Sequence, residues 1–463
     1  MPEPGSQLEQ AGRPASGSAS AAGPARGAAI AARGRALVAA ALPDPLLRNA
    51  TSLMLNTALT GGTGLAYWLI AARRYAPAEV GRASAALAAM NLLAGVTALS
   101  LTGSLTRFIP QSGHGTRALV LRVYAVSAGV SALGGVLFVF GAGRLGPSYA
   151  ELTTAAAGAA FIISVVGWAI FTLQDGVLIG LRSAVWLPAE NGLFGAVKIV
   201  LLIALATAMP RGGIFLSWML PVFLALPLVN LLIFARIIPQ HASRTGHRQP
   251  PTARQVSRFL AGDYVGATCL LVTGSLVPVL VALLTTPRLT AYFYVAWTVG
   301  ATLDLLGVNM ATSLTVEGAF DAGRLAASCA SALRRGLIVL VPTTAVLAAA
   351  AYPLMALFGP GYARFGAPVL ALLAAATLPR SLTELYLGAL RAQSRTSRVA
   401  LVQAVRGVVL LAGVLLLTSL LGVIGAAIGV LAGQLLAAAL ILPGLWRLVS
   451  GARLPAAARR SEV

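Results

Sequence analysis

The sequence predicts an all-α integral membrane protein of about twelve transmembrane helices, arranged as two pseudo-symmetric six-helix bundles. The first observation is composition: 58% of the 463 residues are hydrophobic, 10% are charged, and the mean hydropathy is +0.84. Soluble domains have about 45–50% apolar and about 25% charged residues. The second observation is a series of long apolar runs, and the third is an internal repeat.

The apolar runs predict the spans. An α-helix needs about 20 residues to cross roughly 30 Å of hydrocarbon. Twelve runs of that length cover residues 50–72, 81–105, 119–141, 153–178, 187–208, 214–237, 259–284, 290–315, 334–358, 365–390, 397–419 and 423–446. Residues 1–45 are rich in Ala, Gly, Pro, Ser and Arg, so we expect a disordered cytoplasmic tail there.

Arginine placement predicts the orientation. With twelve spans the connections alternate between two sides, and 24 arginines fall on the side of the termini against 7 on the other. The positive-inside rule then makes both termini cytoplasmic. The formal net charge of +21 is therefore a topology signal, and we expect no nucleic-acid partner because the arginines form no dense patch. The Arg-, Ala-, Gly- and Leu-rich composition suggests a bacterial cytoplasmic membrane.

Matching segments indicate a duplication. The longest polar interruption, 239–258, is a predicted cytoplasmic linker between bundles 46–238 and 259–448, and 449–463 forms a second tail. Three pairs recur: Asp175–Arg182 with Glu384–Arg391 and Ser104–Thr106 with Ser313–Thr315, both at an offset of 209, and Gly146–Tyr149 with Gly359–Tyr362 at 213. Six helices per unit give both halves the same orientation, as in transporters that hold the substrate between parallel repeats.

Local sequence then suggests a family. The connection Ala71–Gly81, the segment Thr106–Pro110 and the turns ending in Arg182 and Arg391 resemble polysaccharide-export (Wzx-like) flippases of the multidrug/oligosaccharidyl-lipid/polysaccharide (MOP) exporter superfamily. The resemblance covers about residues 46–448. It implies a MATE-like V of two bundles around a central cavity. It also implies that polyprenyl-pyrophosphate-linked oligosaccharide crosses the membrane by alternating access, for cell-surface polysaccharide biosynthesis.

Other branches and classes remain as alternatives. The first span, Thr51–Ala72, has no acidic residue, unlike many sodium- or proton-coupled multidrug exporters, and twelve spans differ from the fourteen of lipid II flippases. A cation-coupled small-molecule antiporter of the same fold is the second hypothesis, and proton or sodium coupling stays open for both. A membrane-embedded glycosyltransferase is disfavoured because no sizeable extramembrane domain and no catalytic cluster is evident. We therefore expect a transporter and not an enzyme.

Charges inside the spans are the candidate site. A cation at mid-bilayer costs about 2.5–3.5 kcal/mol, so Lys198, Arg380 and Arg406 are expected to face a cavity or a partner. Guanidinium groups grip phosphate with two parallel donors, which suits a pyrophosphate substrate. The structural alternative is pairing, with Arg380 and Glu384 at i, i+4 on one helix face. For the two remaining cations, a cavity and a fixed pair are nearly balanced.

The remaining polar candidates have weaker signals. Asp304, in the eighth span, is predicted to be a coupling site or a counter-ion, as is Glu384, with a fixed ion pair as the alternative. Arg107 and Arg182 are placed at the cytoplasmic mouth, where ordinary topology arginines also occur. Asp175 and Glu190 are expected to be interfacial or capping. Three loop histidines and two cysteines without ligand spacing predict no metal and no cofactor.

Overall fold

The computed structural model describes residues 45–245, 252, 254–256, 271, 274–320, 325–393 and 395–450. Side chains are described in these ranges except at 45–51, 97, 99, 100, 303–310, 312, 313, 315–320 and 396. The described secondary structure is helical, with turns between the helices. Nearly all of the predicted tails, just over half of the predicted seventh span and part of the predicted linker lie outside the described residues.

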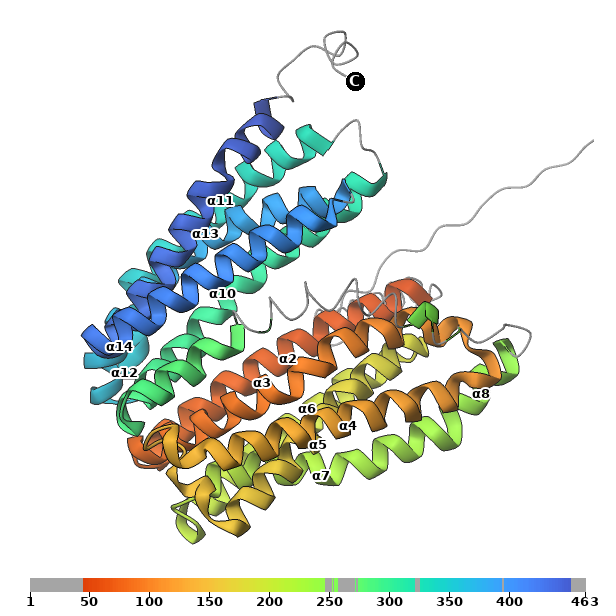
Figure 1. Ribbon diagram of the computed structural model, residues 1–463, viewed down its shortest axis with the longest axis horizontal. Helices are drawn as coiled ribbons and strands as arrows, with labels where there is room; N and C mark the ends of the chain where they lie inside the picture. The colour runs from red at the N-terminus through yellow and green to blue at the C-terminus, as the bar shows by residue number, and fades with distance from the viewer. Residues whose placement is uncertain are drawn as a thin grey trace, which may run out of the picture. The chain divides into compact units, whose positions relative to one another are not determined.

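The first group of helices follows the predicted spans closely. It consists of α2 (Pro45–Arg74), α3 (Pro77–Phe108), α4 (Thr116–Gly141), α5 (Ala155–Gly180), α6 (Leu187–Ala208), α7 (Gly213–Leu232) and α8 (Ile238–Thr245), with a π-helical turn at Ile233–Ile237 joining the last two. Helix α5 packs on α3, α4 and α7, and α6 packs on α7 (Figure 1). Residues 239–245, expected to begin a linker, instead continue as helix.

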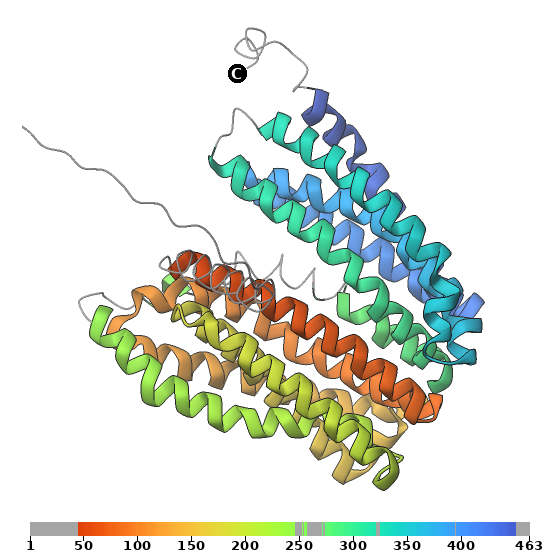
Figure 2. The same ribbon diagram turned by 180° about the vertical axis from the view of Figure 1, so that it is seen from behind.

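The second group contains the 274–284 segment, α10 (Pro287–Phe320), α11 (Leu325–Ala349), α12 (Ala351–Ala356), α13 (Ala367–Ala392) and α14 (Thr396–Ser450). Helix α13 lies between α10, α11 and α14, as the view from behind shows (Figure 2). Helix α14 is two predicted spans in one, because the chain breaks at Gly422, whose φ of 63° and ψ of −143° are not helical. Only glycine adopts such a conformation readily.

Seven described helices are long and apolar enough to cross a membrane, and a bent pair within Pro77–Gln111 would make eight. These seven helices contain eight of the predicted spans, because α14 alone contains two of them, 397–419 and 423–446. Helices α2 and α10 and the shorter apolar helix Gly274–Leu284 coincide with three further predicted spans but are not among the seven.

The duplication is visible in the helix bounds. Helices α5 and α13 both contain 26 residues and begin 212 residues apart, at Ala155 and Ala367. The amide groups of Ser183 and Arg395, also 212 apart, donate to Leu178 and Leu390 five residues back. Gly146 and Gly359, which open the repeated Gly-Pro motif, share positive φ values of 92° and 135°. The structural offset near these turns is therefore 212–213, about one helical turn from the 209 of the sequence alignment.

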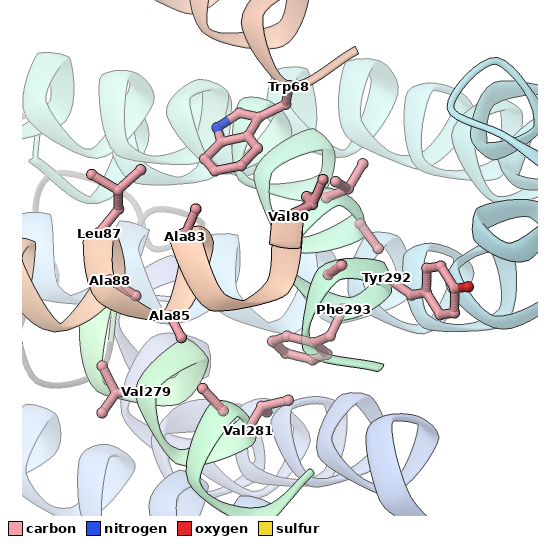
Figure 3. Packing of buried hydrophobic residues seen from close by; sticks show 14 of the residues in the cluster. Trp68, Val80, Ala83, Ala85, Leu87, Ala88, Val279, Val281, Tyr292 and Phe293 are labelled. Atoms are coloured by element: carbon pink, nitrogen blue, oxygen red, sulfur yellow. The ribbon is translucent and has the colours of Figure 1, made fainter. Parts of the chain in front are cut away.

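The two groups of helices meet where α2 ends and α3 and α10 begin. A Cβ on Gly81 would lie 1.6 Å from the backbone oxygen of Pro287, so α3 and α10 touch backbone to backbone. The Arg73 Nε donates to the carbonyl of Leu357, 2.5 Å away. Buried side chains of α3, including Val80 and Leu87, belong to one cluster with residues of the 274–284 segment and α10 (Figure 3).

Candidate functional site

Two of the three predicted intramembrane cations share one pocket. Arg380 of α13 and Arg406 of α14 both line one cavity between α10, α13 and α14. Its other lining residues are Trp297, Gly300, Ala301, Leu373, Ala376, Thr377, Leu410, Val430 and Gln434. We call this cavity the arginine pocket. Both arginines are thus wall residues of one pocket in the part of the chain that the structure describes.

One of these arginines has a buried partner. The Arg406 Nη1 lies 2.8 Å from the Glu384 Oε1, and the two side chains are 2% and 5% exposed. The pair therefore joins α14 to α13, and Arg406 is a partner for Glu384 that the sequence did not suggest. Glu384 is therefore the counter-ion of Arg406.

The arginine pocket retains unsatisfied polar atoms. Among the described residues, the Arg406 Nε and the Gln434 Oε1 are buried without a hydrogen-bond partner. Buried polar atoms in proteins are nearly always paired with protein, water or ligand. The pocket thus offers both a donor and an acceptor to a polar group that enters it. Neither Gln434 nor Thr377 was singled out from the sequence, because a polar residue in an apolar run has no distinctive spacing.

A larger and more apolar cavity adjoins the arginine pocket. It has a volume of about 1150 Å³ and is lined by Ala88, Asn91, Gly95, Ala98, Trp168, Thr172, Leu271, Gly274, Ser275, Pro278, Tyr294 and Trp297. Apart from Leu271, these residues come from α3 and α5 in the first group and from the 274–284 segment and α10 in the second. Trp297 lines both cavities. We call the larger one the aromatic cavity, and Trp297 is the lining residue that it shares with the arginine pocket.

Lys198 lies elsewhere. Its side chain is 3% exposed within the first group, and its Nζ lies 4.0 Å from the centroid of the Trp218 ring, 4.9 Å from that of Phe194 and 5.2 Å from that of Tyr67. Such contacts contribute about 2 kcal/mol or more when the cation is desolvated. Lys198 is not among the residues that line either cavity. The structure thus separates it from the two arginines with which the sequence grouped it.

The remaining candidates do not converge on either cavity. Arg107, in the last turn of α3, is exposed, with its guanidinium 5.9 Å from the Phe108 ring centroid. Arg182 is also exposed and has a φ of 57°, so it closes α5 in the left-handed conformation that usually requires glycine. The side chain of Asp304 lies outside the described residues.

Two acidic residues of the first group, which the sequence analysis expected to be interfacial or capping, are buried. Both carboxylate oxygens of Glu190, on α6, and the Asp175 Oδ1, on α5, are buried with no hydrogen-bond partner among the described residues. Intramembrane carboxylates are rare and commonly functional. Their positions near helix ends suggested capping, and a single sequence does not show that α5 and α6 place them together. No cluster of three or more metal-ligand side chains occurs in the part of the chain that is described.

Comparison with known proteins gives the fold. No protein-family model and no curated protein matches the chain. Among solved structures, an inward-facing multidrug resistance MATE family transporter of the MOP superfamily is 14% identical and covers 89% of this chain and 100% of its own, with a TM-score of 0.66. The lipid II flippase MurJ in an inward closed conformation is 12% identical and covers 86% and 89%, with a TM-score of 0.63.

A third similar structure is a MOP superfamily transporter from Pyrococcus furiosus, described as having a binding pocket of reverse polarity. It is 13% identical and covers 89% of this chain and 96% of its own, with a TM-score of 0.60. The chain therefore has the all-α fold of MOP superfamily membrane transporters, as the sequence predicted. At these identities the likeness concerns the fold alone, and the substrate must be argued from the site.

Proposed function

We propose that the protein is a transporter that moves a polyprenyl-pyrophosphate-linked oligosaccharide across the membrane by alternating access between its two groups of helices. The observation that carries the proposal is that two guanidinium groups, Arg380 and Arg406, line one pocket between the spans. Charged side chains inside spans are costly and usually serve a substrate path. Each guanidinium can bind a phosphate with two parallel hydrogen bonds, so two arginines suit the two phosphates of a pyrophosphate.

The ion pair refines the proposal. Glu384 neutralises part of the positive charge, and it holds the Arg406 guanidinium by one nitrogen while the Nε remains without a partner among the described residues. A substrate phosphate therefore meets a guanidinium that is already oriented and need not be ordered on binding. The glycan would occupy the aromatic cavity, which Trp297 joins to the arginine pocket.

Transport by the full-length protein in proteoliposomes tests the proposal. The probe is a fluorescent polyprenyl-pyrophosphate oligosaccharide, and the readout is its accessibility to a membrane-impermeant quencher. We expect transport to fall at least about tenfold in Arg380→Gln and in the double variant Glu384→Gln/Arg406→Gln, because each removes a charge-assisted contact worth about 1.5–3 kcal/mol. The double variant removes both members of the buried pair, so no uncompensated charge remains in the interior.

The control is Arg364→Gln, which removes an exposed cation of the same helix group that lines neither cavity. It should transport at the normal rate. If all three variants match the unmodified protein, the arginine pocket is not the substrate site. If the unmodified protein moves none of the probe, the assigned substrate class is wrong.

The second candidate function is a cation-coupled small-molecule antiporter. The aromatic cavity favours it, because its lining residues in the described part of the chain are uncharged and three of them, Trp168, Tyr294 and Trp297, carry large rings. Transport of a lipophilic cationic dye in the same proteoliposomes, driven by a proton or sodium gradient and insensitive to Arg380→Gln, would favour this function over the first.

A further inference from the structure

A third cavity lies on the first group of helices, away from the arginine pocket. Its volume is about 1110 Å³, and it is lined by Glu79, Arg82, Ala83, Ala86, Ser148, Glu151, Leu152, Ala157, Ala160, Ile163, Ser164, Gly212, Phe215, Leu216, Met219, Leu220 and Phe223. These residues come from α3, from α5 and the turn before it, and from α7. We call this cavity the α3/α5/α7 groove.

The groove is polar at one end and apolar along its length. Helices α3, α5 and α7 all begin at the polar end, at Pro77, Ala155 and Gly213. The charged lining residues lie before α5 or in the first two turns of α3, and the lining residues further along α5 and α7 are almost all apolar. Several apolar ones are open to the surroundings, such as Ile163 at 58% exposed and Phe223 at 36%. This distribution matches a lipid, with its headgroup at the helix ends and its acyl chain along α5 and α7.

The polar end contains a cluster of three paired charged side chains, and one of its two acids is exposed. The Arg82 guanidinium lies 2.7 Å from a carboxylate oxygen of Glu79 and 3.0 Å from one of Glu151. The Glu79 side chain is 4% exposed, and its other oxygen accepts a hydrogen bond of 2.6 Å from the Gly212 amide. Both carboxylate oxygens of Glu79 therefore already have partners. Glu151 is 53% exposed, and its carboxylate can accept a further hydrogen bond. Two acids against one guanidinium give the cluster a formal charge of −1.

An unpartnered hydroxyl stands beside this cluster. Ser148 lines the groove, is 4% exposed, and its Oγ has no hydrogen-bond partner among the described residues. It belongs to the Gly-Pro-Ser-Tyr motif, which recurs in the second half as Gly359–Tyr362 with Gly361 in place of the serine. The hydroxyl is therefore specific to the first half, although both copies share the positive φ of the leading glycine.

We propose that the α3/α5/α7 groove binds a zwitterionic phospholipid with a primary amine headgroup, of the phosphatidylethanolamine type. The ammonium group lies against Glu151, and the phosphate accepts one hydrogen bond from the Ser148 hydroxyl and lies near Arg82 and the first turn of α5. Helix N-termini favour such anionic groups. The net negative cluster disfavours an anionic headgroup, and a quaternary amine has no N–H to donate to Glu151. The site is independent of the transported substrate.

Native mass spectrometry of the full-length protein tests this binding. The probes are phosphatidylethanolamine, phosphatidylcholine and phosphatidylglycerol with identical acyl chains, each titrated separately. We expect one phosphatidylethanolamine to bind about two- to fivefold more tightly than either of the others, the range of an exposed ion pair. Glu151→Gln should abolish this preference and leave the affinity for phosphatidylcholine unchanged.

A matched pair on α5 locates the site. Ala160 lines the groove, whereas Ala159 is equally exposed on the same helix but is not among the lining residues. Ala160→Phe should remove the bound phosphatidylethanolamine, and Ala159→Phe should retain it. Equal affinities for the three lipids, or retention of the lipid in Ala160→Phe, would overturn the proposal. Tighter binding of a polyprenyl phosphate than of phosphatidylethanolamine would overturn it as well, because the groove would then hold the carrier lipid.

Discussion

At the scale of single residues, two buried cations with the same sequence signal have different surroundings. Arg406 meets a carboxylate at 2.8 Å, whereas the charged atom of Lys198 faces three aromatic rings at 4.0–5.2 Å. A single sequence predicts that each must be compensated, because an isolated charge in the bilayer is costly. It does not reveal the compensating group, since Glu384 and Trp218 are distant in the chain from the cations that they contact.

The aromatic cage makes a prediction for Lys198. Methionine has a similar length and no charge, so Lys198→Met should keep the packing while removing the desolvation cost of the ammonium group. We expect its midpoint of thermal unfolding in detergent to equal or exceed that of the unmodified protein. Transport of the pyrophosphate-linked probe should stay within about twofold, since Lys198 lines neither cavity, and twofold corresponds to well under 1 kcal/mol.

Lys198→Ala serves as the comparison for that prediction. It removes the side chain within a buried site, and the resulting cavity should lower the free energy of unfolding by about 2–5 kcal/mol. A strong loss of transport in Lys198→Met with an unchanged unfolding midpoint would place Lys198 in the transport path after all.

At the scale of helices, apolar runs located the elements well. The predicted span 187–208 coincides with α6 at both ends, and predicted 119–141 lies within α4. The boundaries were predictable because a membrane requires long apolar helices. The register between the two halves was less predictable. Asp175 and Glu384 align at an offset of 209 residues in the sequence, but the helices that carry them begin 212 residues apart. Short matches do not detect an inserted helical turn.

Glycines decide how the two arms of α14 pack. A Cβ on Gly429 would lie 2.6–2.7 Å from backbone atoms of Gly413 and Val414, which cannot move aside as a side chain can. Small residues allow such close approach of helices in membranes. Gly429→Ala should therefore lower the free energy of unfolding by about 1–3 kcal/mol, the usual cost of overpacking. Thermal unfolding in detergent measures this.

Gly407 is the matched control in the same helix. A Cβ there meets nothing within 4 Å, so Gly407→Ala should stabilise the helix by about 0.5–1 kcal/mol through its helix propensity. Equal effects of the two substitutions would mean that the arms of α14 do not pack through Gly429.

At the scale of the whole molecule, the sequence predicted the chemistry of the candidate site better than its location. It named both residues of the arginine pocket, Arg380 and Arg406, because charges stand out in apolar helices. It grouped them with Lys198, which the structure places in the other helix group. Trp297, which lines both cavities, has no distinctive signal in the sequence, because tryptophan in a span is usually interfacial. Only the packing of α10 on α13 distinguishes the two roles.

Alternating access predicts that contacts between the two helix groups break during the cycle. The contact from Arg73, at the end of α2, to the carbonyl of Leu357 is one of them. With Cys269 and Cys329 replaced by alanine, Arg73→Cys/Leu357→Cys should be cross-linked by a short, reducible bifunctional thiol reagent. We expect the cross-link to abolish transport of the pyrophosphate-linked probe and a reductant to restore it, because the tether prevents one group from moving away from the other.

A second cysteine pair is the control, because it tests whether a cross-link within one helix group also abolishes transport. A Cβ on Gly143 would lie 3.6 Å from the Thr153 Cγ2, and both residues are exposed within the first group of helices. Gly143→Cys/Thr153→Cys should form the same cross-link with no loss of transport, since the two residues move as one body in a rocking mechanism. Transport that continues through the Arg73→Cys/Leu357→Cys cross-link would exclude separation of the groups at this contact as a step of the cycle.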